Sequence, residues 1–140
     1  MKLNIRKLKS EDWDTLRGWW KDWGFELIPS KDFLPENGTG GLIVENEDGV
    51  GICSIFIYTS NSKLCHMSWP LSNKNFKNKK IKNKAFELIF LGVKNVCKQH
   101  DKKYVIFYGE DRNFKFQERL QEQGFYKTND NALSSLLLKI

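Results

Sequence analysis

One stretch of the sequence, residues 64–111, most constrains what this chain can fold into. Leu64–Trp69 alternates like a strand, Lys74–Lys84 is a lysine-rich loop, Ala85–His100 is amphipathic, and Tyr104–Tyr108 is a second strand. A strand, a crossover helix and a second strand predict a parallel pair with a right-handed connection. The first backbone N–H groups of the helix would lie beside six lysine side chains. We therefore expect this segment to bind an anion, most simply a phosphate or a pyrophosphate.

The positive charge of the chain is concentrated in that loop. The formal net charge is +6, and residues 74–84 carry six lysines and no acidic residue, so the rest of the chain is neutral overall. A general nucleic-acid-binding protein more often spreads its basic residues over a wide face. The pattern therefore favours a local anion site. Its lysines are Lys74, Lys77, Lys79, Lys80, Lys82 and Lys84.

Length and composition limit the class of protein further. With 140 residues the chain can bury one sizeable core, and we expect a single domain over residues 1–140. No run approaches the roughly 20 apolar residues of a membrane span. The N-terminus lacks the apolar segment of a signal peptide, so we expect a cytoplasmic protein. Whether it is a monomer or a homodimer stays open.

The three cysteines do not form a metal-binding pattern. Cys53, Cys65 and Cys97 are widely spaced, and each lies in an apolar strand or helix pattern. A zinc site would also need His66 or His100 nearby, which the spacing does not indicate. We interpret the cysteines as small buried apolar side chains and expect no metal.

The N-terminal part predicts a strand followed by a helix. Residues 1–9 alternate like a strand, and Ser10 is a suitable N-cap for a helix that ends at Gly24. Trp19 lies off the apolar stripe of this helix, so we expect it at a rim or a partner surface. The stripe itself predicts core packing and consists of Trp13, Leu16, Trp20 and Trp23.

The middle part predicts a loop and an antiparallel meander. Residues 25–41 contain two prolines and three glycines, which predicts a loop with one short turn around residues 30–34. Pro70 has no N–H, so we expect the third strand of the meander to end there and to bulge or splay. A parallel pair that separates in this way leaves a crevice in which α/β sheets bind ligands. The three strands are expected at residues 41–45, 50–58 and 63–69, with Asp48-Gly49 as the first turn.

The C-terminal part completes an α/β (α+β) fold. Residues 113–123 predict a helix that Gly124 ends, and residues 125–128 and 132–140 predict a last hairpin around Asn129–Asn131. The expected order is strand, helix, three strands, helix, strand, helix and two strands. This order predicts a mixed central sheet whose fourth and fifth strands are parallel and splayed.

This order of elements, together with four short motifs, resembles a known family. The motifs are WWKDWG, FLPENGTGGLIVEN, YTSNSK and NFKFQERLQEQGF. Along almost the whole chain they resemble the GNAT (GCN5-related N-acetyltransferase) superfamily, and they look like the small GNAT-like proteins often encoded by bacteriophages. A viral origin would place the protein in the host cytoplasm.

The resemblance implies acetyl-CoA as co-substrate. Its pantetheine arm would pair with the backbone after the bulge, and its pyrophosphate would bind the N–H groups of the loop that opens the central helix. The residues that the resemblance assigns to coenzyme A are Leu71, Ser72, Lys77, Asn78, Lys79, Lys80, Ile81, Lys82, Asn113 and Phe116.

Two positions depart from the family pattern. The pyrophosphate loop of the family has spaced glycines that allow a positive φ, but residues 77–83 contain none. Left-handed geometry costs most other residues about 1–2 kcal/mol, which one or two lysine–phosphate hydrogen bonds of about 1.5–3 kcal/mol each would offset. The tyrosine that commonly protonates the leaving thiolate is replaced by Leu120, although Asn113 and Gly124-Phe125 match the pattern.

Candidates for the catalytic base and its neighbours lie near the expected crevice. His66 has a side-chain pKa near the working pH, although a lone strand histidine is more often a hydrogen-bonded or surface residue. Glu110 and Asp111 are alternatives, or they simply cap the helix that follows. Tyr58 would either hydrogen-bond the acceptor or pack.

Two hypotheses about function follow. In the first, the chain transfers an acetyl group from acetyl-CoA to an amine, on a small molecule or a protein, by direct attack. In the second, it is a GNAT-shaped binding protein with impaired catalysis, whose lysine loop binds an acidic host protein or a nucleic acid. A solvated lysine run without a partner is the remaining interpretation.

Overall fold

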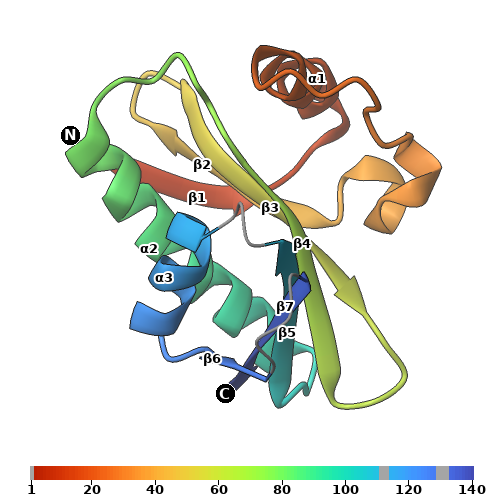
Figure 1. Cartoon of the computed structure of the whole chain (residues 1–140). Coiled ribbons are helices and arrows are strands. Elements are labelled where there is room, and N and C mark those ends of the chain that lie inside the picture. Colours follow the sequence, from red (N-terminus) through yellow and green to blue (C-terminus); the bar gives the residue numbers. More distant parts are fainter. Residues whose placement is uncertain (1, 111–113, 129–132) are drawn as a thin grey trace. The chain divides into compact units, whose positions relative to one another are not determined.

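The structure is a computed structural model that describes residues 2–110, 114–128 and 133–140 (Figure 1). The described residues form a mixed sheet with the strand order β1-β2-β3-β4-β5-β7-β6, which confirms the expected fold class. The chain divides into two compact units. The first unit comprises Met1–Ile57 and Trp69–Gly92, and the second comprises Tyr58–Ser68 and Val93–Ile140.

The order of helices and strands along the chain is also the expected one, with differences at several ends. In chain order the elements are β1 (Leu3–Lys7), the 3-10 helix η1 (Ser10–Asp12), α1 (Trp13–Asp22), η2 (Lys31–Phe33), η3 (Pro35–Gly38), β2 (Gly41–Asn46), β3 (Gly51–Thr59), β4 (Leu64–Ser72), α2 (Lys79–Gln99), β5 (Tyr104–Glu110), α3 (Phe114–Glu122), β6 (Tyr126–Lys127) and β7 (Leu133–Lys139).

Strands β1, β2 and β3 are antiparallel, as predicted, and Figure 1 shows β1 beside β2. The turn between β2 and β3 is held by Asn46, whose side-chain oxygen accepts hydrogen bonds from the N–H groups of Asp48 and Val50 at 3.0 and 2.9 Å. Gly49 in this turn has a φ of 79°, which favours glycine. The predicted Asp48-Gly49 turn is therefore confirmed.

Helix α1 begins later than the sequence predicts, because Ser10 is not its N-cap. Ser10–Asp12 form η1, and the N-cap residue of that turn is Lys9, whose N–H donates to the Asp12 carboxylate at 2.8 Å. Asp12 also accepts two hydrogen bonds from Arg6, at 2.8 and 2.9 Å. A carboxylate held by a guanidinium thus takes the capping role that we assigned to the Ser10 hydroxyl.

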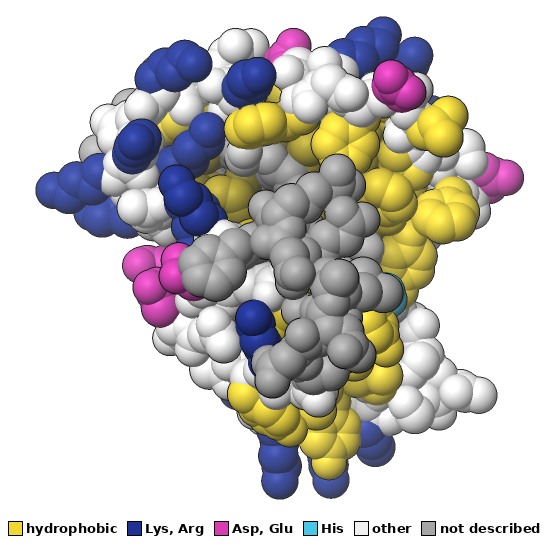
Figure 2. All heavy atoms as spheres, viewed as in Figure 1, with side chains coloured by type: hydrophobic (Ala, Val, Ile, Leu, Met, Phe, Trp, Pro, Cys, Tyr) yellow, Lys and Arg dark blue, Asp and Glu magenta, His cyan; other side chains and the backbone are white. Residues whose placement is uncertain are grey.

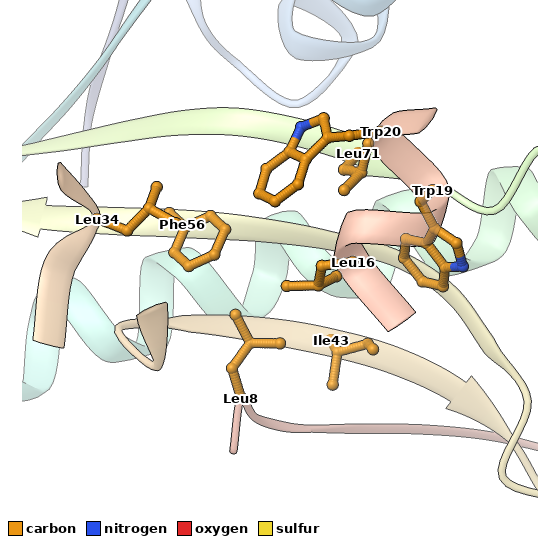
Figure 3. Close-up of a cluster of buried hydrophobic side chains, with 8 residues drawn as sticks. All are labelled: Leu8, Leu16, Trp19, Trp20, Leu34, Ile43, Phe56 and Leu71. Atoms are coloured by element: carbon orange, nitrogen blue, oxygen red, sulfur yellow. The ribbon is translucent and has the colours of Figure 1, made fainter. Parts of the chain in front are cut away.

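The core of the first unit is a hydrophobic cluster against α1 (Figure 3). Trp19 is buried in it, so its expected place at a rim or partner surface is wrong. Trp19 follows the buried Leu16 by three residues and lies on the same side of the helix, so the buried face is wider than our stripe. Trp23 falls just beyond the helix and is 47% exposed. Figure 3 shows the cluster side chains, which are Leu8, Leu16, Trp19, Trp20, Leu34, Ile43, Phe56 and Leu71.

Strand β4 does not end at Pro70, as we expected, but continues to Ser72. The chain is distorted one residue earlier, where Trp69 has a φ of 54°, in the left-handed region that bulky residues rarely adopt. The backbone then pairs again, since the N–H of Asn73 donates to the carbonyl of Ile52 at 2.8 Å. The left-handed backbone of Trp69 accommodates the distortion next to Pro70, so the strand continues beyond the proline.

The second unit contains the predicted parallel pair. Strands β4 and β5 pair in parallel from Leu64–Tyr104 to His66–Ile106, and the register stops there. Strand β5 itself runs on to Glu110 and pairs along its length with β7. The parallel pairing is short, as expected for two strands that separate towards their C-terminal ends.

The C-terminal elements agree with the sequence prediction within a residue or two. Helix α3 is followed by Gly124, with a φ of 99°, and β6 pairs antiparallel with β7. The expected turn at Asn129–Asn131 lies outside the described residues.

The cysteines are buried, as predicted. Cys53, Cys65 and Cys97 are free thiols with side chains in the interior. Burial, with the Cys65 thiol beside it, raises the pKa of Cys97 well above its ordinary value. The described helices include none that is both long enough and apolar enough to cross a bilayer.

Candidate functional site

The lysine-rich segment is half loop and half helix. Helix α2 begins at Lys79, six residues before the predicted start at Ala85, so Lys79–Lys84 are helical rather than part of a loop. Asn78 explains the early start. Its side-chain oxygen accepts the N–H of Ile81 at 3.1 Å, and its carbonyl accepts the N–H of Lys82 at 3.0 Å, as an N-cap does.

The charges of the side chains at this helix start are unfavourable for the helix itself. The first turn lies at the positive end of the helix dipole. An acidic residue there stabilises the helix, whereas each lysine lowers the stability of the folded chain by roughly 0.3–1 kcal/mol. The first turn of α2 holds no acidic residue. Lys77 and Lys79–Lys80 are exposed at this end, and Figure 2 shows Lys and Arg side chains gathered where α2 begins in Figure 1. Local rules are broken in this way mainly at functional or strained positions.

The backbone of this segment is relaxed. The family pattern indicates left-handed residues here, so the missing glycines are expected to cost energy. None of residues 73–84, all of which the structure describes, has a positive φ. The helix start at Lys79 replaces the glycine-dependent loop with ordinary helical geometry, so the first N–H groups are presented without strain.

The loop before α2 is tied to the end of α1 in the first unit. The Trp23 indole N–H donates to the Ser72 carbonyl at 2.8 Å. The Lys74 ammonium lies 5.2 Å from the centre of the Trp23 ring and donates to the Asp22 carbonyl at 3.3 Å. The Asn75 amide donates to the Asp22 carboxylate at 3.3 Å. Lys74 is therefore bound within the first unit. Its contact with Trp23 was not predicted, because we had assigned Trp23 to the core stripe of the helix.

His66 lies between two tyrosine rings in the second unit. Its ring centre is 5.7 Å from that of Tyr58 and 5.2 Å from that of Tyr108, the latter in an edge-to-face arrangement. Burial lowers the pKa of His66 below its ordinary value of 6.5. The imidazole is therefore neutral at neutral pH and can accept a proton. The structure brings the two predicted residues His66 and Tyr58 together.

Tyr108 was missed by the sequence reasoning. The parallel register pairs His66 with Ile106, and Tyr108 lies two residues further along β5, on the same side of the strand as Ile106. The alternation of Tyr104, Ile106 and Tyr108 would have indicated this, had the register been known. Tyr108 is 52% exposed, so this group of rings reaches the surface.

Comparisons with known proteins agree on one fold. No family model matches the sequence, and no curated protein matches it significantly. A GCN5-related N-acetyltransferase from Kribbella flavida matches with a TM-score of 0.78 at 9% identity, over 99% of this chain and 98% of that chain. The PaiA N-acetyltransferase from Thermoplasma acidophilum, in complex with coenzyme A, gives 0.72 at 17% identity over 100% of both chains. The chain has the GNAT fold.

A longer protein contains the same GNAT fold. N-acetylglutamate synthase from Neisseria gonorrhoeae, complexed with coenzyme A and N-acetyl-glutamate, matches with a TM-score of 0.75 at 11% identity. The match covers 99% of this chain and 35% of that chain, so this chain spans about a third of the synthase.

Several positions to which the GNAT resemblance gives a role can be located. The Leu71 side chain is buried in the core cluster, so only its backbone is available to a ligand. Leu120, at the position of the GNAT tyrosine, is completely buried. Phe116 packs edge-to-face on Phe107, with ring centres 4.9 Å apart. Asn113 and Asp111 lie outside the described residues, as does the side chain of Glu110.

The described part of the chain holds no group of three His, Cys, Asp or Glu side chains that could bind a metal ion. The described residues instead include an Asn78-capped helix start with exposed lysines in the first unit, and a neutral imidazole between two tyrosine rings in the second.

Proposed function

We propose that the chain is an acetyl-CoA-dependent N-acyltransferase that transfers an acetyl group to an amine. The observation that carries this is the start of α2, where Asn78 caps a helix whose first turn holds lysines and no acid, within a GNAT fold. Backbone N–H groups at a helix N-terminus, reinforced by ammonium groups, suit the pyrophosphate of coenzyme A.

The residues that hold the cofactor have separate roles in this proposal. The N–H groups and side chains of Lys77–Lys82, with Asn78 and Ile81 among them, bind the pyrophosphate. The backbone of Leu71 and Ser72 pairs with the pantetheine arm. The Trp23 indole N–H already donates to the Ser72 carbonyl. Asn113 and Phe116 keep the cofactor roles that the resemblance gives them.

The reaction is a direct attack on the thioester. The amine nitrogen attacks the acetyl carbonyl carbon, a C–N bond forms, the C–S bond breaks, and coenzyme A leaves as a thiolate. Neutral His66 takes the proton that the nitrogen loses, with Tyr58 beside it, and Glu110 is the alternative base. An ordinary thiol has a pKa near 8.5, so a thiolate leaves without a general acid and Leu120 does not abolish transfer.

Calorimetric titration with acetyl-CoA tests the binding step. We expect binding by the natural chain, and at least tenfold weaker binding by Lys77→Gln/Lys79→Gln/Lys80→Gln, since each charged hydrogen bond contributes about 1.5–3 kcal/mol. The matched control, Lys98→Gln/Lys103→Gln/Lys139→Gln, removes the same charge from exposed positions elsewhere and should bind normally. Absence of binding at about 1 mM, the upper end of ordinary KM values, would refute the proposal.

A second candidate function is a GNAT-fold binding protein without catalysis. The burial of Leu120 favours it, because the core offers no hydroxyl at the position of the usual acid. The lysines at the start of α2 would then bind an acidic protein or a nucleic acid, with the steep salt dependence of counterion release. Coenzyme A binding without thiol release from acetyl-CoA, across a panel of amines, would select this function over the enzyme.

A further inference from the structure

The carbonyl group of Ser72, at the end of β4, points away from β3. The next N–H along the chain, that of Asn73, donates to the Ile52 carbonyl of β3 at 2.8 Å. In a trans peptide the C=O and the following N–H point in opposite directions, so the Ser72 carbonyl points to the other side of β4. That is the side on which β5 pairs earlier in the strand, from Leu64 to His66. Ser72 lies beyond this pairing, where the edge of β4 offers a backbone acceptor.

The indole N–H of Trp23 occupies this acceptor. Trp23 directly follows α1, and its indole nitrogen lies 2.8 Å from the Ser72 carbonyl oxygen. A donor in this position replaces the N–H that a pairing strand would supply to the edge. The ring also fills the space next to the carbonyl, so no further chain can pair with Ser72 while the indole stays there.

The pantetheine arm requires the same acceptor in the proposed function. The arm is a chain with amide groups, so it presents N–H donors and carbonyl acceptors to a strand edge as an extended peptide does. The proposed pairing with the backbone of Leu71 and Ser72 would direct such an N–H at the Ser72 carbonyl. The indole of Trp23 and an amide of the ligand therefore compete for one position.

Trp23 is placed so that its side chain can turn away without opening the core. The side chain is half-exposed, whereas Trp19 and Trp20 of the core cluster are buried. Trp23 also lies beyond the last residue of α1, so rotation of its side chain disrupts no helical turn. The Lys74 ammonium, 5.2 Å from the ring centre, belongs to an exposed side chain and can follow the ring.

We infer that Trp23 is a gate of the coenzyme site, whose indole N–H holds the Ser72 carbonyl until an amide N–H of the pantetheine arm takes its place. This rests on the proposed function, since it names a step in the binding of the same cofactor. The exchange replaces one hydrogen bond by another, so the carbonyl has a donor before and after it.

Calorimetric titrations of the natural chain and of Trp23→Phe test the inference. Phenylalanine keeps an aromatic ring beside Lys74 but has no N–H, so it does not compete for the Ser72 carbonyl. We expect Trp23→Phe to bind acetyl-CoA about threefold to tenfold more tightly, the change that one lost competing hydrogen bond predicts. The nucleotide half of coenzyme A carries the pyrophosphate without the pantetheine arm. It should bind the natural chain and Trp23→Phe equally.

A matched control and a second readout complete the test. Phe25 is exposed to a similar degree, so Phe25→Leu removes a comparable ring without an N–H donor and should leave both affinities unchanged. In NMR spectra of the natural chain, the Trp23 indole N–H resonance should shift with acetyl-CoA and stay in place with the nucleotide half. This readout does not depend on the folding of any variant.

The outcomes separate this inference from the proposed function. Unchanged or weaker binding of acetyl-CoA by Trp23→Phe, or an equal change for the nucleotide half, would overturn the gate and leave the proposed function standing. An indole resonance that does not move when acetyl-CoA binds would overturn it too. If neither the natural chain nor Trp23→Phe bound acetyl-CoA, the proposed function would fail, and the gate with it.

Discussion

At the scale of single residues, His66 shows how packing sets chemistry. The imidazole lies between the rings of Tyr58 and Tyr108, and burial lowers its pKa below 6.5. A base with a lowered pKa stays deprotonated over a wider pH range, although it pulls the proton less strongly. In the proposed reaction the acceptor amine is mostly protonated at neutral pH. A base that is itself deprotonated at that pH is available to accept the proton of the amine.

The pH profile of the reaction tests this role. The acid limb of kcat/KM should have its midpoint below pH 6.5, because His66 must be neutral to accept a proton. His66→Gln should lower kcat/KM about 100-fold and remove that limb. His100→Gln, which changes the other histidine of the sequence, should leave both unchanged. A limb that persists in His66→Gln would assign the titration to another group.

Asp12 is a second residue whose environment makes a pH-dependent prediction. Hydrogen bonds from Arg6 lower the pKa of Asp12 below its ordinary value of 3.8. The unfolded chain therefore takes up the proton first as the pH falls, and the stabilisation present at neutral pH is lost below about pH 3.8. Asp12→Asn should cost about 1–2 kcal/mol at pH 7, and this difference should shrink on acidification.

Urea denaturation at several pH values measures the Asp12 effect. Asp14→Asn, at an exposed position in the first turn of α1, is the control and should change stability by less than about 0.5 kcal/mol. A constant difference between Asp12→Asn and the natural chain from pH 7 to pH 3 would rule out the ion pair as its cause.

At the scale of elements, α2 combines a good cap with an unfavourable charge pattern. Lys79→Gln/Lys80→Gln should make the unliganded chain more stable, by about 0.3–1 kcal/mol for each lysine removed, because repulsion at the positive end of the helix dipole is relieved. The same variant should bind acetyl-CoA more weakly. Higher stability combined with weaker acetyl-CoA binding is the result expected for lysines that serve a ligand-binding site.

Thermal unfolding with and without acetyl-CoA separates the two effects. Lys98 lies in the last turn of α2, where a lysine is favourable, so Lys98→Gln should lower stability slightly and leave affinity unchanged. If Lys79→Gln/Lys80→Gln lowered both stability and affinity, these lysines would have a structural role instead.

Two glycines in α1 and β2 give predictions of opposite sign. At Gly18, in α1, an added Cβ meets nothing within 4 Å, so Gly18→Ala should stabilise the helix by about 0.5–1 kcal/mol. At Gly41, in β2, a Cβ would lie 2.1 Å from the Ile55 carbonyl oxygen. Gly41→Ala should therefore cost more than about 3 kcal/mol, the upper range for overpacking. Urea midpoints measure both, and equal effects would contradict the packing of β2 on β3.

The sequence predicted which helices and strands form better than it predicted where they begin or which residues they contact. Alternation and turn residues were sufficient for the strands, because they reflect local geometry. The start of α2 was missed because acidic residues usually mark a helix start, and this one carries lysines. Trp19 was misplaced because the predicted stripe was too narrow, since Trp19 follows the buried Leu16 by three residues and shares its face. Tyr108 was missed because its contact with His66 depends on a register that no local pattern specifies.

At the scale of the whole molecule, the GNAT fold is present although the Kribbella and Thermoplasma acetyltransferases share only 9% and 17% of residues with this chain. Function has to be argued from the site, since one fold hosts many functions. The buried Leu120 is the feature that bears most on whether this chain catalyses acetyl transfer.

The lysine-loaded start of α2 also has a consequence for the lifetime of the protein. A ligand that binds only the folded chain stabilises it by RT ln(1 + [L]/Kd), about 2.7 kcal/mol at a hundredfold excess over Kd. An empty copy keeps its uncompensated repulsion, unfolds more often, and offers itself more readily to proteases. If the start of α2 binds coenzyme A as proposed, we expect the half-life of this protein in a cell to rise and fall with the supply of that cofactor.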